Sequence, residues 1–126
     1  MADAPYTVYQ RHLQRGELAY QFSPRGQRPV FYPRAVSPYD VDETLEWRIS
    51  QGRGTVYSST AIARRDGSEY NVALIDLDEG FRLMSRVEGL PPHDVPIGLR
   101  VQFRAHPAGD TEEDPYPVFY PEGVQP

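Results

Sequence analysis

The stretch between residues 22 and 39 contains four prolines, at positions 24, 29, 33 and 38, together with Gly26. Proline lacks a backbone N–H and its ring clashes with the preceding helical turn, so this density excludes a helix and allows only short extended pieces and turns. Such a segment depends on its neighbours to hold it in place. Most of the regular structure is therefore expected elsewhere in the chain.

The residues ahead of this stretch predict a short helix. Tyr9, His12 and Leu13 follow helical spacing within residues 6–16, and Gly16 is a typical C-terminal stop. Residues 1–50 are therefore expected to form one unit, in which a helix leads into the proline-rich segment.

The second half of the chain alternates β-branched and aromatic runs with turn residues, which is typical of antiparallel strands. Turn signals occur at residues 66–68 (DGS) and 78–80 (DEG). The expected strands cover residues 54–65, 70–77, 81–87, 98–105 and 116–120. Five strands with a long connection between the third and the fourth favour a mainly β fold, with a five-stranded OB-fold barrel over residues 51–126. The edge fragment of a β-sandwich is the alternative.

Composition and charge exclude several kinds of protein. The chain has no cysteine, so disulfides, thiolate metal sites and cysteine nucleophiles are ruled out. Its formal net charge is -5, whereas nucleic-acid binders usually carry a basic face, so nucleic acid is not an expected partner. No window reaches the roughly 18 apolar residues of a membrane span, and we expect a soluble cytoplasmic protein.

Five pieces of the sequence, in matching order and spacing, resemble the zinc-ribbon and OB-fold family known as domain of unknown function 35 (DUF35). They are YPR at 32–34, LEW at 45–47, GRGTVYS at 52–58, VALIDLDEGFRLM at 72–84 and IGLRV at 97–101. The likeness extends over about residues 8–121.

The resemblance implies a short N-terminal helix, a rubredoxin-like ribbon with two cysteine pairs, and an OB barrel. Members of the family accompany thiolase-fold enzymes, and their ribbon and barrel have been proposed to handle acyl-CoA. The resemblance therefore implies a partner subunit of a thiolase-fold enzyme, or an acyl-CoA-binding module, and not an independent catalyst.

The sequence departs from the family at the metal-binding positions. The two cysteine pairs would fall near Phe22 and Arg25 and near Ser37 and Asp40, and these residues supply no thiolate. We therefore expect a degenerate, cysteine-free ribbon with no zinc and no other cofactor. Aromatic packing would hold its shape, and the ribbon would serve as a docking surface.

The candidates for binding a partner or a ligand are Phe31, Tyr32, Arg34, Trp47, Arg53, Arg82 and Arg86, and none is expected to be catalytic. Flanking glycines would let the backbone at Arg53 approach a phosphate or carboxylate; a β-bulge at this position is the alternative. Arg82 and Arg86 are four apart on one expected strand, which suits either a basic stripe for the CoA head group or a plain solvent face. Phe31, Tyr32 and Trp47 are expected to join ribbon and barrel.

Other polar groups fit simpler roles. His12, His93 and His106 lie on three different elements and are expected to be surface or capping residues, not a metal or base site. Asp76 and Asp78 share a strand face but adjoin a turn, which favours a turn-forming role over a paired-carboxylate site. The hypotheses for function are a companion subunit of a thiolase-fold enzyme, a free-standing acyl-CoA binder, and an OB-type binder of single-stranded nucleic acid.

Overall fold

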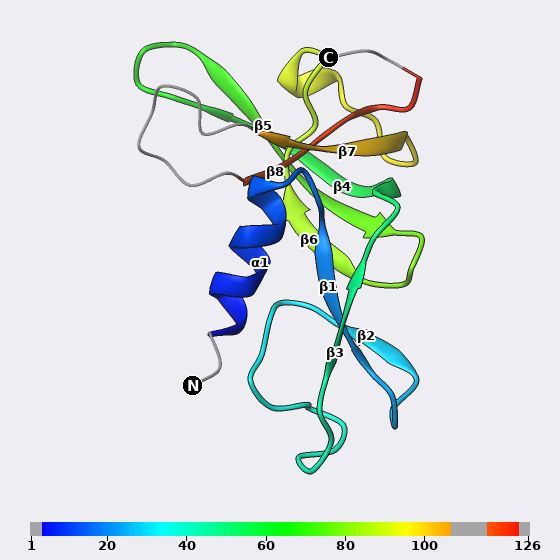
Figure 1. Cartoon of the computed structure of the whole chain (residues 1–126). Helices are drawn as coiled ribbons and strands as arrows, with labels where there is room; N and C mark the ends of the chain where they lie inside the picture. The colour runs from blue at the N-terminus through cyan, green and yellow to red at the C-terminus, as the bar shows by residue number, and fades with distance from the viewer. Residues whose placement is uncertain (1–3, 107–115, 124–126) are drawn as a thin grey trace.

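The computed structural model describes residues 4–106 and 116–123. Helix α1 (Pro5–Gln14) is followed by three short strands, β1 (Ala19–Ser23), β2 (Arg28–Val30) and β3 (Glu46–Ile49). The later strands are β4 (Arg53–Ala63), β5 (Glu69–Leu77), β6 (Arg82–Ser85), β7 (Arg100–His106) and β8 (Tyr116–Pro121), and the short 3-10 helix η1 (Pro92–Asp94) lies between β6 and β7. Figure 1 shows the larger sheet at one end of the molecule, β2 and β3 at the other, and α1 alongside.

Helix α1 confirms the helix predicted over residues 6–16, with slightly shifted bounds. Pro5 lies in the first turn, where its missing N–H leaves no helical bond unmade. Gly16 follows the last turn with a φ of 79°, a conformation that glycine adopts without strain. The buried side chains Tyr9 and Leu13 are four residues apart and therefore lie on one face. No helix in the described part of the chain is long and apolar enough to pass through a bilayer.

All five predicted barrel strands are present, in a sheet of order β6-β5-β4-β7-β8 whose neighbouring strands are antiparallel. The two edges of this sheet meet just beyond β6, where Val87 forms a parallel bridge with Phe119. The N–H of Phe119 donates to the carbonyl of Arg86 at 2.9 Å, and the N–H of Glu88 donates to the carbonyl of Phe119 at 2.8 Å. These bonds join the edges, so the mainly β OB-type fold is confirmed and the β-sandwich fragment is not.

The barrel core follows from the alternation of side chains along β5. Ala73, Ile75 and Leu77 are buried, while the residues between them are only partly covered, as the period of two in a strand requires. They pack against apolar side chains of the neighbouring strands: Val56, Leu83, Val101, Phe103 and Phe119. The side chains on the outward face of β4, β5 and β6 do not take part in this core and are accessible to other parts of the chain or to a partner.

Residues 19–49 hold more regular structure than the sequence predicts. Strand β1 pairs antiparallel with both β2 and β3, which gives a three-stranded sheet of order β2-β1-β3, called the small sheet below. Pro29 lies opposite Phe22 in the edge strand β2, a position where proline is tolerated. β3 is absent from the sequence prediction because four residues are too short a run to show a period.

Candidate functional site

The contact between the small sheet and the barrel is centred on Phe31. Its ring stacks on Phe81 at 5.1 Å and meets Tyr9 of α1 edge-on at 5.7 Å, measured between ring centroids. Tyr20 of β1 stacks on the same Phe81 at 4.7 Å. Burial raises the pKa of Tyr9 well above its usual range, so its hydroxyl stays neutral. These four rings are called the aromatic joint below.

Two other residues expected in this joint lie beside it. Trp47 of β3 packs against the core, and its ring centroid is 6.1 Å from that of His12. Tyr32 has its ring 4.6 Å from Phe31, but its hydroxyl accepts the backbone N–H of Met84 at 3.1 Å and more than half of the residue is exposed. Tyr32 therefore links the small sheet to the edge strand β6 and still presents an open ring surface.

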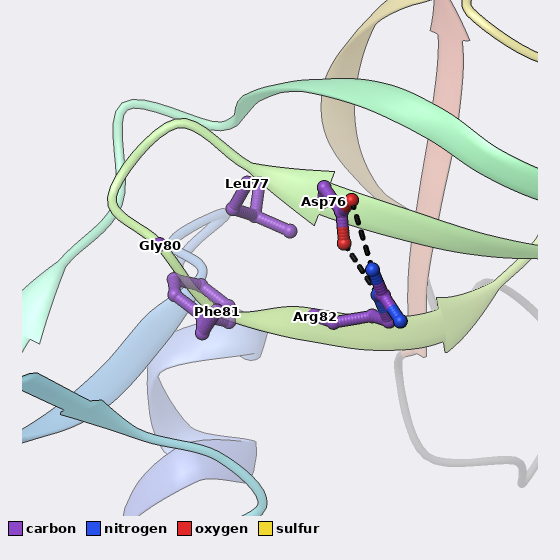
Figure 2. Close-up of a pocket in the computed structure, with 5 residues that line it drawn as sticks. All are labelled: Asp76, Leu77, Gly80, Phe81 and Arg82. Carbon is purple, nitrogen blue, oxygen red and sulfur yellow. Dashed lines mark hydrogen bonds and ion pairs between the residues drawn. The ribbon is translucent and has the colours of Figure 1, made fainter.

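Arg82 borders a hollow of about 460 Å³ at the turn between β5 and β6. Figure 2 shows the Arg82 guanidinium bonded to both oxygens of Asp76, with Leu77, Gly80 and Phe81 completing the lining. The two N–H···O distances are 2.5 and 3.1 Å, and these hydrogen bonds raise the pKa of Arg82. The hollow is an open surface depression on a single hairpin, with a cation already paired at its rim.

Tyr57 contributes to the same surface, although the sequence does not single it out. The pairing of β4 with β5 is irregular between Val56 and Ser58, so Tyr57 occupies a β-bulge and is half exposed. The Arg82 guanidinium lies 3.5 Å from the centroid of its ring. Sequence alternation alone could not reveal this residue, because a bulge breaks the period. The exposed residues of this surface, Tyr32, Tyr57, Arg82 and Met84, are called the outer face below.

Arg86 does not continue a basic stripe from Arg82. Strand β6 ends at Ser85, and the Arg86 guanidinium lies 5.0 Å from the ring centroid of Tyr116 and 5.7 Å from that of Tyr70. A second hollow of about 300 Å³ is lined by these three residues together with Met84. The two arginines are thus held at separate places on either side of Met84.

The glycines around Arg53 are explained by packing inside the barrel. A Cβ on Gly54 would lie 2.7 Å from the carbonyl oxygen of Asp76, and a Cβ on Gly52 would lie 2.9 Å from the Cβ of Phe103. No β-bulge lies at this position, since Arg53, Gly54 and Thr55 pair regularly with β7, but the solvated Arg53 that this alternative expected is present. Arg53 itself is exposed.

Arg34 takes part in the small sheet through its backbone. Its N–H donates to the side-chain oxygen of Gln21 at 2.7 Å, and its carbonyl accepts from the side-chain nitrogen of Gln21 at 2.8 Å. Gln21 is buried on β1, so this pair of bonds fixes the loop after β2 to the sheet. The side chain of Arg34 is exposed.

The four positions expected to replace the cysteine pairs do not all face one another. Phe22 has the Arg48 guanidinium 3.6 Å above its ring. Arg25 is exposed and bonds Asp40 at 2.6 Å, which holds the pKa of that carboxyl below its usual value. Ser37 is buried and shares a hydrogen-bond partner with Ser23, the residue after Phe22. Successive residues of a strand point to opposite faces, and it is the side chain of Ser23, not that of Phe22, that shares Glu43 with Ser37.

The histidines and carboxylates do not converge. His12 contacts Glu17 at 2.9 Å, while His93 contacts Glu69 at 3.2 Å on a different element, and the side chain of His106 lies outside the described part of the structure. The carboxylates of Asp76 and Asp78 are each bound by an arginine, Arg82 and Arg100 respectively. Across residues 4–104 and 116–123, no group of three or more histidine, aspartate and glutamate side chains is placed to hold a metal.

Comparison with known proteins connects this geometry to a family. Residues 47–106 match the family model of the C-terminal OB-fold domain of ChsH2. A chain of the solved Ltp2-ChsH2(DUF35) aldolase is similar with a TM-score of 0.82 and 23% identity, over 95% of this chain and 96% of that chain. A DUF35-family protein of unknown function from Sulfolobus solfataricus is similar with a TM-score of 0.66 and 14% identity, over 92% and 84% of the two chains. No curated protein sequence matches.

Proposed function

We propose that the chain is a companion subunit of a thiolase-fold enzyme, because residues 47–106 match the family model of the ChsH2 C-terminal OB-fold domain and solved DUF35 structures share its fold, which supports the DUF35 resemblance. It docks on that enzyme and helps to shape a site for acyl-CoA. The observation that carries the proposal is the end-to-end likeness to a chain of the Ltp2-ChsH2(DUF35) aldolase, which covers 95% of this chain. The likeness includes the helix and the small sheet as well as the barrel.

A non-catalytic role is supported by the state of the polar side chains. A general base or a nucleophile needs a free, positioned group, and a catalytic site brings several such groups together. Here Asp76 and Asp78 are each held in an arginine pair, and His12 and His93 are bonded to separate glutamates. Catalysis is therefore assigned to the partner.

The outer face is the docking surface that we assign to the partner. Tyrosine, methionine and arginine are enriched in protein interfaces relative to other surfaces. Tyr32, Tyr57 and Met84 are each more than half exposed, at 56%, 51% and 59%. Because Tyr32 comes from the segment after β2 and Met84 from β6, a partner on this surface touches both parts of the chain at once.

Acyl-CoA is assigned to the hollow beside Arg82, at the border between this chain and its partner. A phosphate group would have to share or replace the Asp76 carboxylate on the Arg82 guanidinium, whose planar fork suits phosphate oxygens. Leu77 and Phe81 supply an apolar floor. The hollow is lined by residues of one hairpin and is open to solvent, so the partner enzyme would have to close it. Arg53 is a further cation for the anionic head group, near the start of β4.

Co-expression with neighbouring genes of the source genome, followed by affinity capture and size-exclusion chromatography, tests the proposal. The expected result is a stable complex with a thiolase-fold enzyme whose acyl-CoA turnover rises on addition of this chain, while the chain alone has none. A chain that turns over acyl-CoA by itself, or one that elutes as a free monomer beside its candidate enzyme, would contradict the proposal.

The two other hypotheses are separated by direct binding measurements. Calorimetry with acyl-CoA and the chain alone should show no tight binding if the site needs the partner. Binding to single-stranded oligonucleotides at physiological salt should be weaker than about 10 µM, because phosphate neutralisation needs free cations. Tight and salt-sensitive oligonucleotide binding would instead support the OB-type nucleic-acid role.

A further inference from the structure

Two buried serine hydroxyls in the small sheet converge on one carboxylate. Ser23 at the end of β1 is fully buried, and Ser37 in the loop after β2 is 2% exposed. The hydroxyl of Ser23 donates to Oε2 of Glu43 at 2.6 Å, and the hydroxyl of Ser37 donates to the same oxygen. Oε1 of Glu43 accepts the backbone N–H of Arg25 at 2.9 Å. A single side chain thus holds the β1–β2 turn and the loop at residues 37–40.

The same hydroxyls also organise the backbone of their own loops. The N–H of Gly26, three residues after Ser23, donates to its Oγ at 2.8 Å. The N–H groups of Tyr39 and Asp40, two and three residues after Ser37, donate to its Oγ at 3.1 and 3.3 Å. Each loop therefore wraps its backbone N–H groups around one buried side-chain atom, and that atom is bonded to Glu43.

The residues around this point do not fit a zinc ion, although the resemblance implies one. Structural zinc sites need four converging donors, usually thiolates and imidazoles. Hydroxyls occupy positions 23 and 37, Gly26 has no side chain, and the Asp40 carboxylate is engaged by Arg25. A Cβ on Gly26 would lie 2.8 Å from the Ser23 hydroxyl, so a side chain at position 26 would face the same point as that of Ser23. Glycine supplies no metal-binding donor there.

We propose that the carboxylate of Glu43 takes the structural place of the metal ion in this ribbon. It cross-links the two loops through hydrogen bonds, so the small sheet is independent of metal and sensitive to protonation of one residue. The inference stands on the geometry of Ser23, Ser37 and Glu43 and does not depend on the identity of any partner.

Sensitivity to acid follows from the direction of each hydrogen bond. Both acceptor sites of the Ser37 hydroxyl are used by backbone N–H groups, so the hydroxyl must donate, and Glu43 must accept. Burial pushes the pKa of Glu43 up, but the bonds from Ser23, Ser37 and the Arg25 N–H outweigh it and hold the pKa below its usual value. The nearby charged groups are Asp40, which opposes ionisation of Glu43, and Arg25, which is paired with Asp40.

The sign of the pH effect is therefore fixed. A carboxyl whose pKa is lower in the folded state stabilises that state fully above its unfolded value, about 4.3 for glutamate. The stabilisation is lost as the pH falls from about 5 through the folded pKa. The small sheet should accordingly loosen in that acidic range.

The test compares Glu43→Gln with Asp42→Asn, which removes the same charge one residue earlier from an exposed side chain. Trp47, the single tryptophan of the chain, lies on β3 and reports the small sheet by fluorescence. At pH 7 we expect Glu43→Gln to lower the midpoint of the Trp47 thermal transition by about 5 °C or more. A glutamine amide has only one accepting oxygen, so it can accept from the two hydroxyls or from the Arg25 N–H, but not from all three donors. The variant should also show a smaller change in midpoint between pH 5 and pH 3 than the unchanged chain, while the contribution of Asp40, whose pKa is lowered by Arg25, remains.

Asp42→Asn should behave like the unchanged chain in both measurements. If Glu43→Gln does not fold, Ser37→Ala, which removes one hydrogen-bond donor to Glu43, should lower the Trp47 midpoint by a smaller amount.

The absence of a metal is tested separately. Elemental analysis should find less than about a tenth of an equivalent of zinc, and a chelator should leave the Trp47 midpoint unchanged. Equal midpoints for Glu43→Gln and the unchanged chain, stoichiometric zinc, or a midpoint lowered by the chelator would each overturn the inference.

Discussion

The barrel and the small sheet are stabilised by different kinds of contact. In the barrel, Ile75, Val101 and Phe119 are fully buried, and removal of apolar area from water is the main source of stability. In the small sheet, the most buried side chains include Ser23 and Ser37, which are bonded to a carboxylate rather than packed in an apolar cluster. The barrel carries its own core, whereas the small sheet depends on polar bonds and on the aromatic joint.

This difference separates global from local effects of mutation. Loss of a barrel core residue should destabilise the whole chain, because the other elements pack on that core. Loss of a contact in the small sheet should affect that sheet and the docking surface first. The variants below test the comparison, beginning with the largest expected effect.

Phe119→Ala should be the most destabilising single change. The side chain is fully buried, and truncation of a buried phenylalanine costs about 3–5 kcal/mol of unfolding free energy. Urea denaturation followed by circular dichroism measures this loss. Ile62→Ala on β4, where the side chain is 39% exposed, is the control and should stay within about 0.5 kcal/mol. Similar losses for both variants would show that the barrel is not held by an apolar core.

Phe31→Ala should cost less and should act on the coupling between the two parts. The residue is partly buried and contacts Phe81 and Tyr9, so we expect a loss of about 2–3 kcal/mol. Because the aromatic joint holds the small sheet on the barrel, Trp47 fluorescence should report unfolding at lower urea than the circular dichroism of the sheets. If the Trp47 fluorescence and circular dichroism transitions of the variant still coincide, the small sheet and the barrel unfold together. Other contacts than the aromatic joint would then couple them.

The same contrast explains what the sequence could predict. The barrel strands are found because their burial alternates with the period that strands impose, and the turn residues at 66–68 and 78–80 mark their ends. Glu43 could not be found in this way, since its partner Ser23 lies 20 residues away and nothing local marks the bond. Tyr57 was missed because a β-bulge turns it outward, and Phe31 and Trp47 could be named as joint residues but not assigned their contacts.

Tyr32→Ala should weaken docking more than folding. The residue is 56% exposed, and truncation of an aromatic anchor in an interface typically costs about 1–3 kcal/mol of binding free energy. Calorimetry with the purified partner enzyme measures the change in affinity. Tyr32→Phe keeps the ring and removes only the hydroxyl bonded to Met84, so it should retain most of the affinity. If the alanine variant binds as well as the unchanged chain, the outer face is not the docking surface.

The smallest effect on folding is expected for Arg82→Gln. This variant tests whether a residue of the outer face can matter for binding the partner while it contributes little to the free energy of unfolding. Arg82 and Asp76 are both 45% exposed, and an exposed ion pair contributes less than about 1 kcal/mol. Arg100→Gln is the control, because Arg100 of β7 also binds both oxygens of an aspartate, Asp78, at 2.8 Å, but is not among the residues that line the hollow beside Arg82.

Both arginine variants should lose little unfolding free energy, with the larger loss for Arg100→Gln, since Arg100 also contacts Thr55 and Glu122. The two variants should differ in binding. Arg82 lies on the ring of Tyr57 and borders the hollow at the β5–β6 turn, so its loss should raise the dissociation constant for the partner roughly tenfold, equivalent to about 1.4 kcal/mol. Arg100→Gln removes the same charge and should leave the dissociation constant unchanged. Equal weakening by both variants would mean that docking responds to net charge and not to this surface. An unchanged affinity for Arg82→Gln would show that the partner does not cover the hollow, and the acyl-CoA site would then have to be sought elsewhere.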